Sequence, residues 1–287
     1  MVGPNLFPVQ TGKTMTLDKI NNRGIVIVGC GKMGSALLAG WLNRGLSLAA
    51  TWVIDPNPSD WLSGLAGKGL HLNAPLPSEP AVVLIAVKPQ MMGTALPQIA
   101  EFSGGDVLIL TVAAGTTLST YEKVFGTLAR IVRSMPNTPA AVGRGITAII
   151  GNQATTDSDL AMAEDLLSAV GQVVRLDGED QMDAVTAVSG SGPAYVFHLI
   201  EALAAAGEAQ GLPAALAMTL ARATVIGAGE LAHEAPETAA QLRINVTSPG
   251  GTTAAALGVL MNEDTGFPPL LRRAVKAAAD RGRELGK

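Results

Sequence analysis

A glycine-rich segment near the start of the chain has the spacing of a phosphate-binding loop. It consists of Gly29-Cys30-Gly31-Lys32-Met33-Gly34. It follows an apolar run at residues 24–28 and precedes a helical pattern, which is the context that this motif requires. Gly29 permits a tight turn, Gly31 lets a pyrophosphate approach the backbone, and Gly34 lets helix and strand touch. An ordinary turn that needs glycine is the alternative, and the strand-loop-helix context disfavours it. The segment therefore predicts a dinucleotide site.

The choice between NADH and NADPH depends on Asp55, which ends the second apolar run. An acid at this offset usually binds the adenosine ribose of NAD, and its charge repels a 2'-phosphate. No arginine lies in residues 55–59, although a strand-end Asp is also a common turn former. Both coenzymes stay open. Cys30, within the glycine-rich segment, is interpreted as a small residue without a redox role. Lys88 lies at the end of another predicted strand, where its side chain faces either the coenzyme or water.

A second glycine-rich segment, Asn245 to Thr253, predicts a site for a small anion. Its Ser248-Pro249-Gly250-Gly251 turn leads into a helical run at residues 254–260. Free backbone N–H groups converge at a helix start, and the two glycines leave space for a carboxylate or phosphate. Helix capping by one hydroxyl is the alternative, but it does not account for two glycines and several hydroxyls together. The residues alone therefore predict a nicotinamide-dependent oxidoreductase that acts on a small anion without a metal.

The elements that must position these segments alternate over the first part of the chain. Apolar runs predict strands at residues 24–28, 51–54, 82–87, 107–112, 130–135, 146–150 and 172–176, and helical patterns lie at residues 35–44, 91–99, 118–125 and 157–170. This alternation is typical of an α/β fold with a Rossmann-type doubly wound, mostly parallel sheet. We expect a mobile leader at residues 1–20, the dinucleotide-binding domain at 21–179, and an all-α substrate-binding and dimerisation domain at 180–287.

Composition sets limits on partners and location. The chain has 287 residues, 48% of them hydrophobic, with a net charge of -4. Helical patterns at residues 194–210 and 214–232 are apolar around most of their circumference, which favours dimerisation. The absence of a basic cluster argues against nucleic acid, and we expect no membrane-spanning segment. A single cysteine suits a reducing compartment, so a cytoplasmic protein is expected.

Beyond these arguments, the chain resembles pyrroline-5-carboxylate reductases from about Gly24 to its end. The resemblance rests on the glycine loop and on four further blocks: Ala86-Val87-Lys88-Pro89-Gln90, Met135-Pro136-Asn137-Thr138-Pro139-Ala140, Asp183 to Tyr195, and Val246-Thr247-Ser248-Pro249-Gly250-Gly251-Thr252-Thr253. It implies reduction of the C=N bond of 1-pyrroline-5-carboxylate to L-proline by NADPH or NADH, the last step of proline biosynthesis. It also implies a homodimer, often assembled further into a decamer.

The resemblance also assigns site residues. Coenzyme contacts are implied for Gly29, Cys30, Gly31, Lys32, Met33, Gly34, Asn73, Ala86, Val87, Lys88, Pro89 and Ala114, and the strand-end position adds Asp55. Substrate contacts are implied for Glu179, Asn245 and Thr252, and Thr253 is the implied catalytic residue. The anion-binding turn adds Ser248, Gly250 and Gly251 as substrate contacts. Two other functions stay open. A reductase of the beta-hydroxyacid dehydrogenase type normally needs a catalytic lysine, and none occurs between Lys123 and Lys276. A non-catalytic dinucleotide sensor would leave the hydroxyl-rich helix start unexplained.

Overall fold

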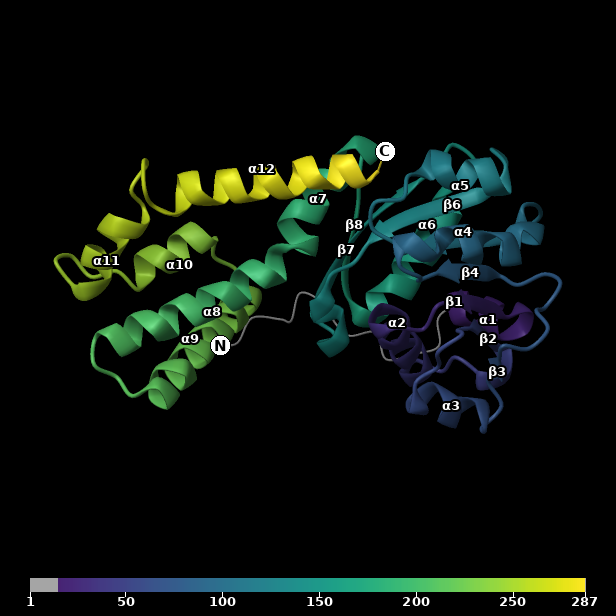
Figure 1. Ribbon diagram of the computed structural model, residues 1–287, viewed down its shortest axis with the longest axis horizontal. Coiled ribbons are helices and arrows are strands. Elements are labelled where there is room, and N and C mark those ends of the chain that lie inside the picture. Colours follow the sequence, from purple (N-terminus) through teal and green to yellow (C-terminus); the bar gives the residue numbers. More distant parts are fainter. Residues whose placement is uncertain (1–14, 287) are drawn as a thin grey trace. The chain divides into compact units, whose positions relative to one another are not determined.

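The computed structural model describes residues 15–286 (Figure 1). They divide into two compact units. The sheet unit includes residues 15–190 and 279–286, and the helical unit is residues 191–278. The division falls after Gly190 rather than after residue 179, because the turns that follow the last strand still pack on the sheet. Residues 279–286 also belong to the sheet unit, whereas the boundaries expected from the sequence place them in the helical domain.

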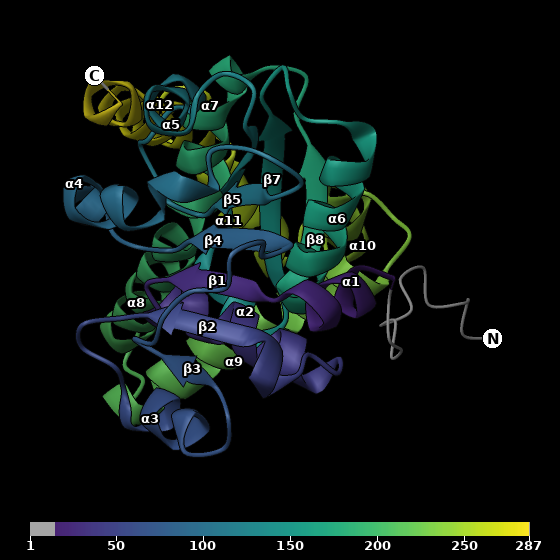
Figure 2. The same cartoon turned by 90° about the vertical axis from the view of Figure 1, so that its right-hand side faces the viewer.

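The sheet unit is built on eight strands in the order β3-β2-β1-β4-β5-β6-β7-β8. Figure 2 shows β3, β2, β1, β4 and β5 following one another. The strands are β1 (Ile25–Val28), β2 (Thr51–Ile54), β3 (His71–Leu72), β4 (Val82–Ile85), β5 (Leu108–Thr111), β6 (Arg130–Met135), β7 (Gly145–Gly151) and β8 (Gly171–Arg175). All neighbours are parallel except β6 and β7. The predicted doubly wound, mostly parallel sheet is confirmed.

Helices cover both faces of this sheet because alternate strand residues point to opposite sides. Ile25 and Ile27 of β1 belong to one apolar cluster, and Val26 and Val28 to another. The first cluster includes residues of α1 (Met15–Arg23), α2 (Lys32–Asn43), α3 (Asp60–Ala66) and α6 (Asp157–Leu167). The second includes residues of α4 (Met92–Ala95) and α5 (Leu118–Phe125). Two buried layers therefore hold the strand ends in fixed register.

The expected mobile leader is wrong for residues 15–20. These residues form most of helix α1, and the side chains of Leu17 and Ile20 are buried in the first apolar cluster. An amphipathic helix of this length folds only when its apolar face is covered, and the sequence pattern does not show that covering surface. Residues 1–14 of the expected leader lie outside the described part of the chain.

Opposite the carboxyl ends of the strands, charged side chains tie the amino ends together. Asp106, just before β5, contacts Arg23 and Arg130 at 2.6 Å each and Lys19 at 3.5 Å. The hydrogen bond from Arg130, with smaller contributions from Arg23 and Lys19, lowers the pKa of Asp106 to about 2. Because Asp106 is largely exposed, water screens this network and its contribution to stability is modest.

The helical unit contains α8 (Gly192–Ala209), α9 (Ala214–Glu234), α10 (Ala239–Asn245), α11 (Thr252–Leu260) and most of α12 (Phe267–Leu285). Helices α8 and α9 pack side by side (Figure 1). A Cβ on Gly207 of α8 would lie 3.3 Å from Cβ of Ala217 on α9, so small residues bring the two helices together. The predicted helices at residues 194–210 and 214–232 are confirmed.

Large apolar side chains of the helical unit are exposed in the single chain. Phe197 is 60% exposed, Ile226 is 65% exposed and Val259 is 70% exposed, whereas the buried side chains of α8 and α9 are alanines. A folded unit with an apolar surface of this kind normally buries it against another surface. The helical unit therefore has the character of one side of an interface.

Helix α9 is long and apolar enough to cross a membrane by length and composition alone. An 18-residue window of this 21-residue helix has a mean hydropathy of 1.3, so by length and composition one segment does reach the size that was not expected from the sequence. The helix is interrupted by Arg222 and Glu230, and charged residues are costly inside a bilayer. Its alanine-rich composition suits close packing against other helices equally well.

Candidate active site

The glycine loop joins β1 to α2 in the geometry that a dinucleotide requires. Gly29 has a φ of +86°, and a Cβ there would lie 2.7 Å from Cγ1 of Val87. A Cβ on Gly34 would lie 2.6 Å from the carbonyl oxygen of Gly29. A side chain is thus excluded at both positions by close packing of the strand, the loop and the helix.

Gly31 has a different environment, because no atom lies within 4 Å of the position of its missing Cβ. Gly31 is the N-cap residue of α2, and no side chain caps the helix. The backbone N–H groups of Lys32 and Met33, in the first turn of the helix, are therefore available to an anion. Open space beside uncapped amides is the arrangement that binds a pyrophosphate, so the residues present fit a dinucleotide.

Asp55 and Asn73 form the neighbouring edge of this site. The carboxylate of Asp55 accepts hydrogen bonds from the backbone N–H groups of Cys30 at 2.8 Å and Asn57 at 2.9 Å. The side chain of Asn73 bonds the backbone N–H and carbonyl oxygen of Asp55, at 2.9 Å each. Asn73 has a φ of 49°, a left-handed conformation that asparagine adopts more readily than most residues. The turn after β2 is thereby fixed against the glycine loop.

The other predicted coenzyme residues follow β4 and β5. Ala86 donates its backbone N–H to Val28 at 2.8 Å and extends the pairing of β4 with β1. Lys88 and Pro89 are exposed in the turn that follows, and Ala114 is exposed in the turn after β5. Because β1, β2, β4 and β5 are parallel neighbours, their carboxyl ends lie along one edge of the sheet. The structure thus brings the predicted coenzyme residues to a single edge, where such sheets bind nucleotides.

Cys30 is buried, and its Sγ lies 3.6 Å from Oγ of Ser35. Burial raises the pKa of the Cys30 thiol. The hydrogen bond with Ser35 lowers this pKa by less, and the nearby charge of Asp55 raises it further. A protonated, buried thiol is a poor nucleophile. This environment agrees with the interpretation of Cys30 as a small residue without a redox role.

Glu179 lies in the turn after β8, where it is already engaged. Its Oε1 accepts a hydrogen bond from Arg133 at 2.6 Å and one from the backbone N–H of Leu118 at 2.7 Å. The side chain of Arg133 is 6% exposed and that of Glu179 is 30% exposed. Sequence reasoning missed Arg133, although a charged residue inside an apolar strand signals a buried partner. The identity of that partner, 46 positions away, has no local signal.

Apart from Glu179, the predicted substrate residues lie at the end of α10 and in the turn before α11, in the helical unit. Gly250 has a φ of +71°, and the N–H of Gly251 bonds the carbonyl oxygen of Ser248 at 3.0 Å. No side chain caps α11. The N–H groups of its first residues, Thr252 and Thr253, therefore face outward from an uncapped helix start. The hydroxyl side chain of Thr253 is half-buried, whereas that of Thr252 is exposed.

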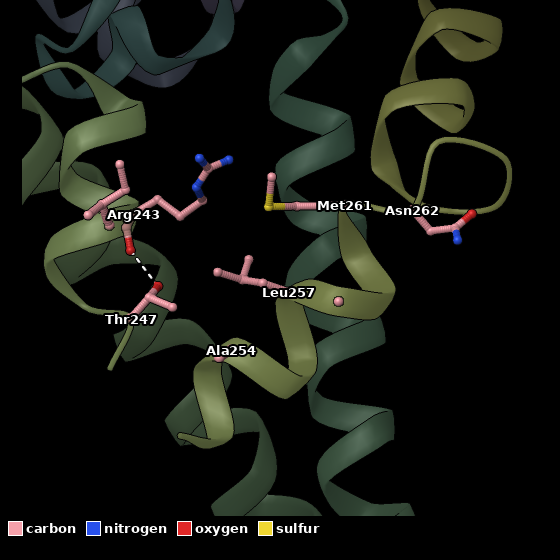
Figure 3. Close-up of a pocket in the computed structure, with 8 residues that line it drawn as sticks. Arg243, Thr247, Ala254, Leu257, Met261 and Asn262 are labelled. Atoms are coloured by element: carbon pink, nitrogen blue, oxygen red, sulfur yellow. Dashed lines mark hydrogen bonds between the residues drawn. The ribbon is translucent and has the colours of Figure 1, made fainter. Parts of the chain in front are cut away.

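An apolar hollow of about 450 Å³ lies beside this turn (Figure 3). It is lined by Arg243, Ile244, Thr247, Ala254, Leu257, Gly258, Met261 and Asn262. In Figure 3 the guanidinium of Arg243 extends from α10 toward Met261, and Oγ1 of Thr247 donates to the carbonyl oxygen of Arg243 at 2.6 Å. Asn245, at the end of α10, accepts a hydrogen bond from Gln241 at 2.8 Å. The hollow thus adjoins the predicted substrate turn on the side of α10.

Family models match both units. One described as "Pyrroline-5-carboxylate reductase dimerisation" matches residues 179–285, and one described as "NADP oxidoreductase coenzyme F420-dependent" matches residues 24–115. The second match covers the glycine loop and the first five strands. The first covers all the predicted substrate residues and connects the helical unit with oligomerisation.

Relatives extend across nearly the whole chain. A pyrroline-5-carboxylate reductase of Methanosarcina acetivorans is 37% identical over 272 residues, covering 93% of this chain and 100% of the relative. A solved pyrroline-5-carboxylate reductase of Coxiella burnetii is 35% identical, with a TM-score of 0.85, covering 92% of this chain and 99% of that one. The pyrroline carboxylate reductase of Plasmodium falciparum, solved with NADP bound, is 29% identical, with a TM-score of 0.77. The match covers 93% of this chain and 99% of that one. The chain therefore belongs to the pyrroline-5-carboxylate reductase family.

Proposed function

We propose that this protein reduces the C=N bond of 1-pyrroline-5-carboxylate to form L-proline, the last step of proline biosynthesis. The observation that carries the proposal is the 37% identity to a reductase of this name across both units of the chain. The two glycine-rich segments support it, because one suits a dinucleotide and the other suits a small carboxylate. The side chains needed for such a reaction are few, since a protonated imine is already a strong electrophile.

The residues at the carboxyl edge of the sheet would hold a reduced nicotinamide coenzyme. The first turn of α2, with Gly31 and Lys32, would bind its pyrophosphate, and Asp55 and Asn73 would border the adenosine ribose. The turns at residues 86–89 and at Ala114 would line the rest of the coenzyme. When bound there, the coenzyme supplies a hydride for the imine carbon of the substrate.

The turn before α11 would hold the substrate. The backbone around Gly251 and Thr252, through the N–H groups that face outward at the start of α11, would bind the carboxylate. The hydroxyl of Thr253 would hydrogen-bond the ring nitrogen, which carries the proton in both iminium and product. Hydride addition to the carbon of this iminium gives the secondary amine of proline with no further proton required. Most of the rate enhancement would then come from positioning.

Three more residues belong to the proposed substrate turn. Asn245 and Ser248 border the turn, and Gly250 gives it the left-handed conformation that starts α11. Glu179 also stays a proposed substrate contact. Because its Oε1 already accepts two N–H groups, such a contact would use the second carboxylate oxygen.

We further propose a homodimer formed through the helical unit, with a decamer as the larger assembly. The exposed apolar residues of α8, α9 and α11 support the proposal, because a single chain leaves them in water. We expect size-exclusion chromatography with light scattering to give at least twice the mass of 29.3 kDa at micromolar concentration. A stable monomer under these conditions would contradict the proposal.

A dimer interface is also the proposed environment of α9, in place of a membrane. Its arginine and glutamate fit between protein helices more readily than in a bilayer. We propose no nucleic acid partner, because the net charge of -4 gives no attraction for phosphate polymers. The cytoplasm is the proposed location, since the single cysteine suits a reducing compartment.

The direct test follows absorbance at 340 nm while purified protein oxidises NADH or NADPH in the presence of pyrroline-5-carboxylate. We expect substrate-dependent oxidation and formation of L-proline by amino-acid analysis. A small 3-hydroxy acid with NAD or NADP, run in the opposite direction, tests for a beta-hydroxyacid dehydrogenase. Coenzyme binding without turnover of either substrate would favour a dinucleotide sensor and would refute the proposed activity.

A further inference from the structure

Both oxygens of the Asp55 carboxylate are committed to backbone amides at the edge of the coenzyme site. Oδ2 accepts the N–H of Cys30 at 2.8 Å, and Oδ1 accepts the N–H of Asn57 at 2.9 Å. The main chain of Asp55 is held separately by the side-chain amide of Asn73. The carboxylate is therefore fixed in direction by its own hydrogen bonds and by the turn that carries it.

The position of this carboxylate corresponds to the ribose end of a bound dinucleotide. Asp55 directly follows β2, which pairs with β1 in register from Ile25 to Val28. The N–H of Gly29 also bonds the carbonyl oxygen of Ile54 at 2.8 Å, so the turn after β2 and the glycine loop are adjacent. An acid at the end of the second strand of such a sheet accepts hydrogen bonds from the ribose hydroxyls.

A 2'-phosphate in the same place would need donors that the turn does not provide. Residues 55–59 contain neither arginine nor lysine. Two backbone N–H groups that face this position, those of Cys30 and Asn57, are already occupied by Asp55. A phosphate would therefore approach a carboxylate whose charge repels it, with the adjacent amides already used. Juxtaposed like charges are strongly unfavourable at a binding site.

We propose that Asp55 determines coenzyme specificity in this protein, so that NADH is preferred over NADPH. The residue acts in two ways: its charge repels the 2'-phosphate, and its hydrogen bonds withhold the amides of Cys30 and Asn57 from that group. This inference rests on the proposed coenzyme site. It goes beyond the proposed function, which leaves the choice of coenzyme open.

Equilibrium titration of the purified full-length protein with NADH and with NADPH tests the inference. Energy transfer from tryptophan to the nicotinamide reports binding without turnover. We expect the wild-type protein to bind NADH more tightly by about tenfold to a hundredfold. Asp55→Ser removes the charge and releases both amides, and should shift the Kd ratio toward NADPH by at least about tenfold. Asp55→Asn removes the charge but keeps an acceptor for Cys30, and should give a smaller shift in the same direction.

Asp60→Ser is the matched control, because it removes the same charge from an exposed position in the first turn of α3. It should leave the Kd ratio unchanged. Thermal unfolding checks that each variant is folded, and the Asn73 contacts to Asp55 use main-chain atoms that both Asp55 variants keep. Equal affinity of the wild-type protein for the two coenzymes, or an Asp55→Ser ratio equal to that of wild type, would overturn the inference.

The outcome separates this inference from the proposed function. Preferential binding of NADH without reduction of pyrroline-5-carboxylate would refute the proposed activity and support the role of Asp55. Proline formation at equal kcat/KM with both coenzymes, together with equal Kd values, would support the proposed activity and refute the role of Asp55.

Discussion

Thr253→Val is expected to lower kcat for pyrroline-5-carboxylate reduction by about 10²- to 10³-fold, the usual effect of removing one hydrogen-bonding group at a reacting centre. Valine has nearly the shape of threonine, so the variant removes the hydroxyl and little else. The N–H of residue 253 remains at the uncapped start of α11, and carboxylate binding should persist. We therefore expect a large change in kcat and a small change in KM.

Three measurements make this result specific. The Kd for NADH should not change, because the glycine loop is on the sheet unit and Thr253 is on the helical unit. Thr253→Ser restores a hydroxyl and should recover most of kcat. The melting temperature should remain close to that of wild type, since the half-buried side chain keeps its volume. A Thr253→Val enzyme with wild-type kcat would remove Thr253 from the proposed mechanism.

The sheet was predictable because its signals are local. Residues 130–135 were predicted as a strand with the bounds of β6, since a short run with apolar residues between turns indicates a buried strand. The short strand β3 and the helix α3 were missed. A two-residue strand has too few positions for an apolar pattern, and α3 buries only Leu62. These elements are stabilised by neighbours more than by their own sequence.

The site was predictable to the extent that it depends on backbone conformation. Glycine spacing predicted the tight turn of the proposed coenzyme loop, because the requirement for glycine at Gly29 and Gly34 is built into the residue type. The engagement of Glu179 by Arg133 was not predictable, since the two meet only when the turn after β8 lies against β6 and α5. The same holds for the contact of Asp55 with Cys30. Long-range hydrogen bonds have no local sequence signal, and they decide which polar groups remain available to a ligand.

Gly31→Val is expected to weaken NADH binding by about a hundredfold or more while leaving the protein folded, because a bulky side chain would occupy the space where a pyrophosphate approaches α2. No atom lies within 4 Å of a Cβ at Gly31, so valine meets nothing in the protein itself. The backbone at Gly31 is extended, with a φ of -69°, and lies outside the left-handed region that favours glycine. Tryptophan-to-nicotinamide energy transfer measures the Kd, and thermal unfolding measures the stability.

Two further glycine variants separate loss of the ligand from loss of the fold. Gly34→Val should unfold the protein at a lower temperature, because its Cβ would lie 2.6 Å from the carbonyl oxygen of Gly29, a backbone atom that cannot move aside without displacing the loop. Gly64→Val, in the exposed part of α3 with nothing within 4 Å of its Cβ, should change neither property. In this loop, the close contact at Gly34 comes from packing, whereas the open space at Gly31 leaves room for the proposed ligand. Normal NADH affinity in a folded Gly31→Val protein would show that the open space beside α2 is not where the pyrophosphate binds.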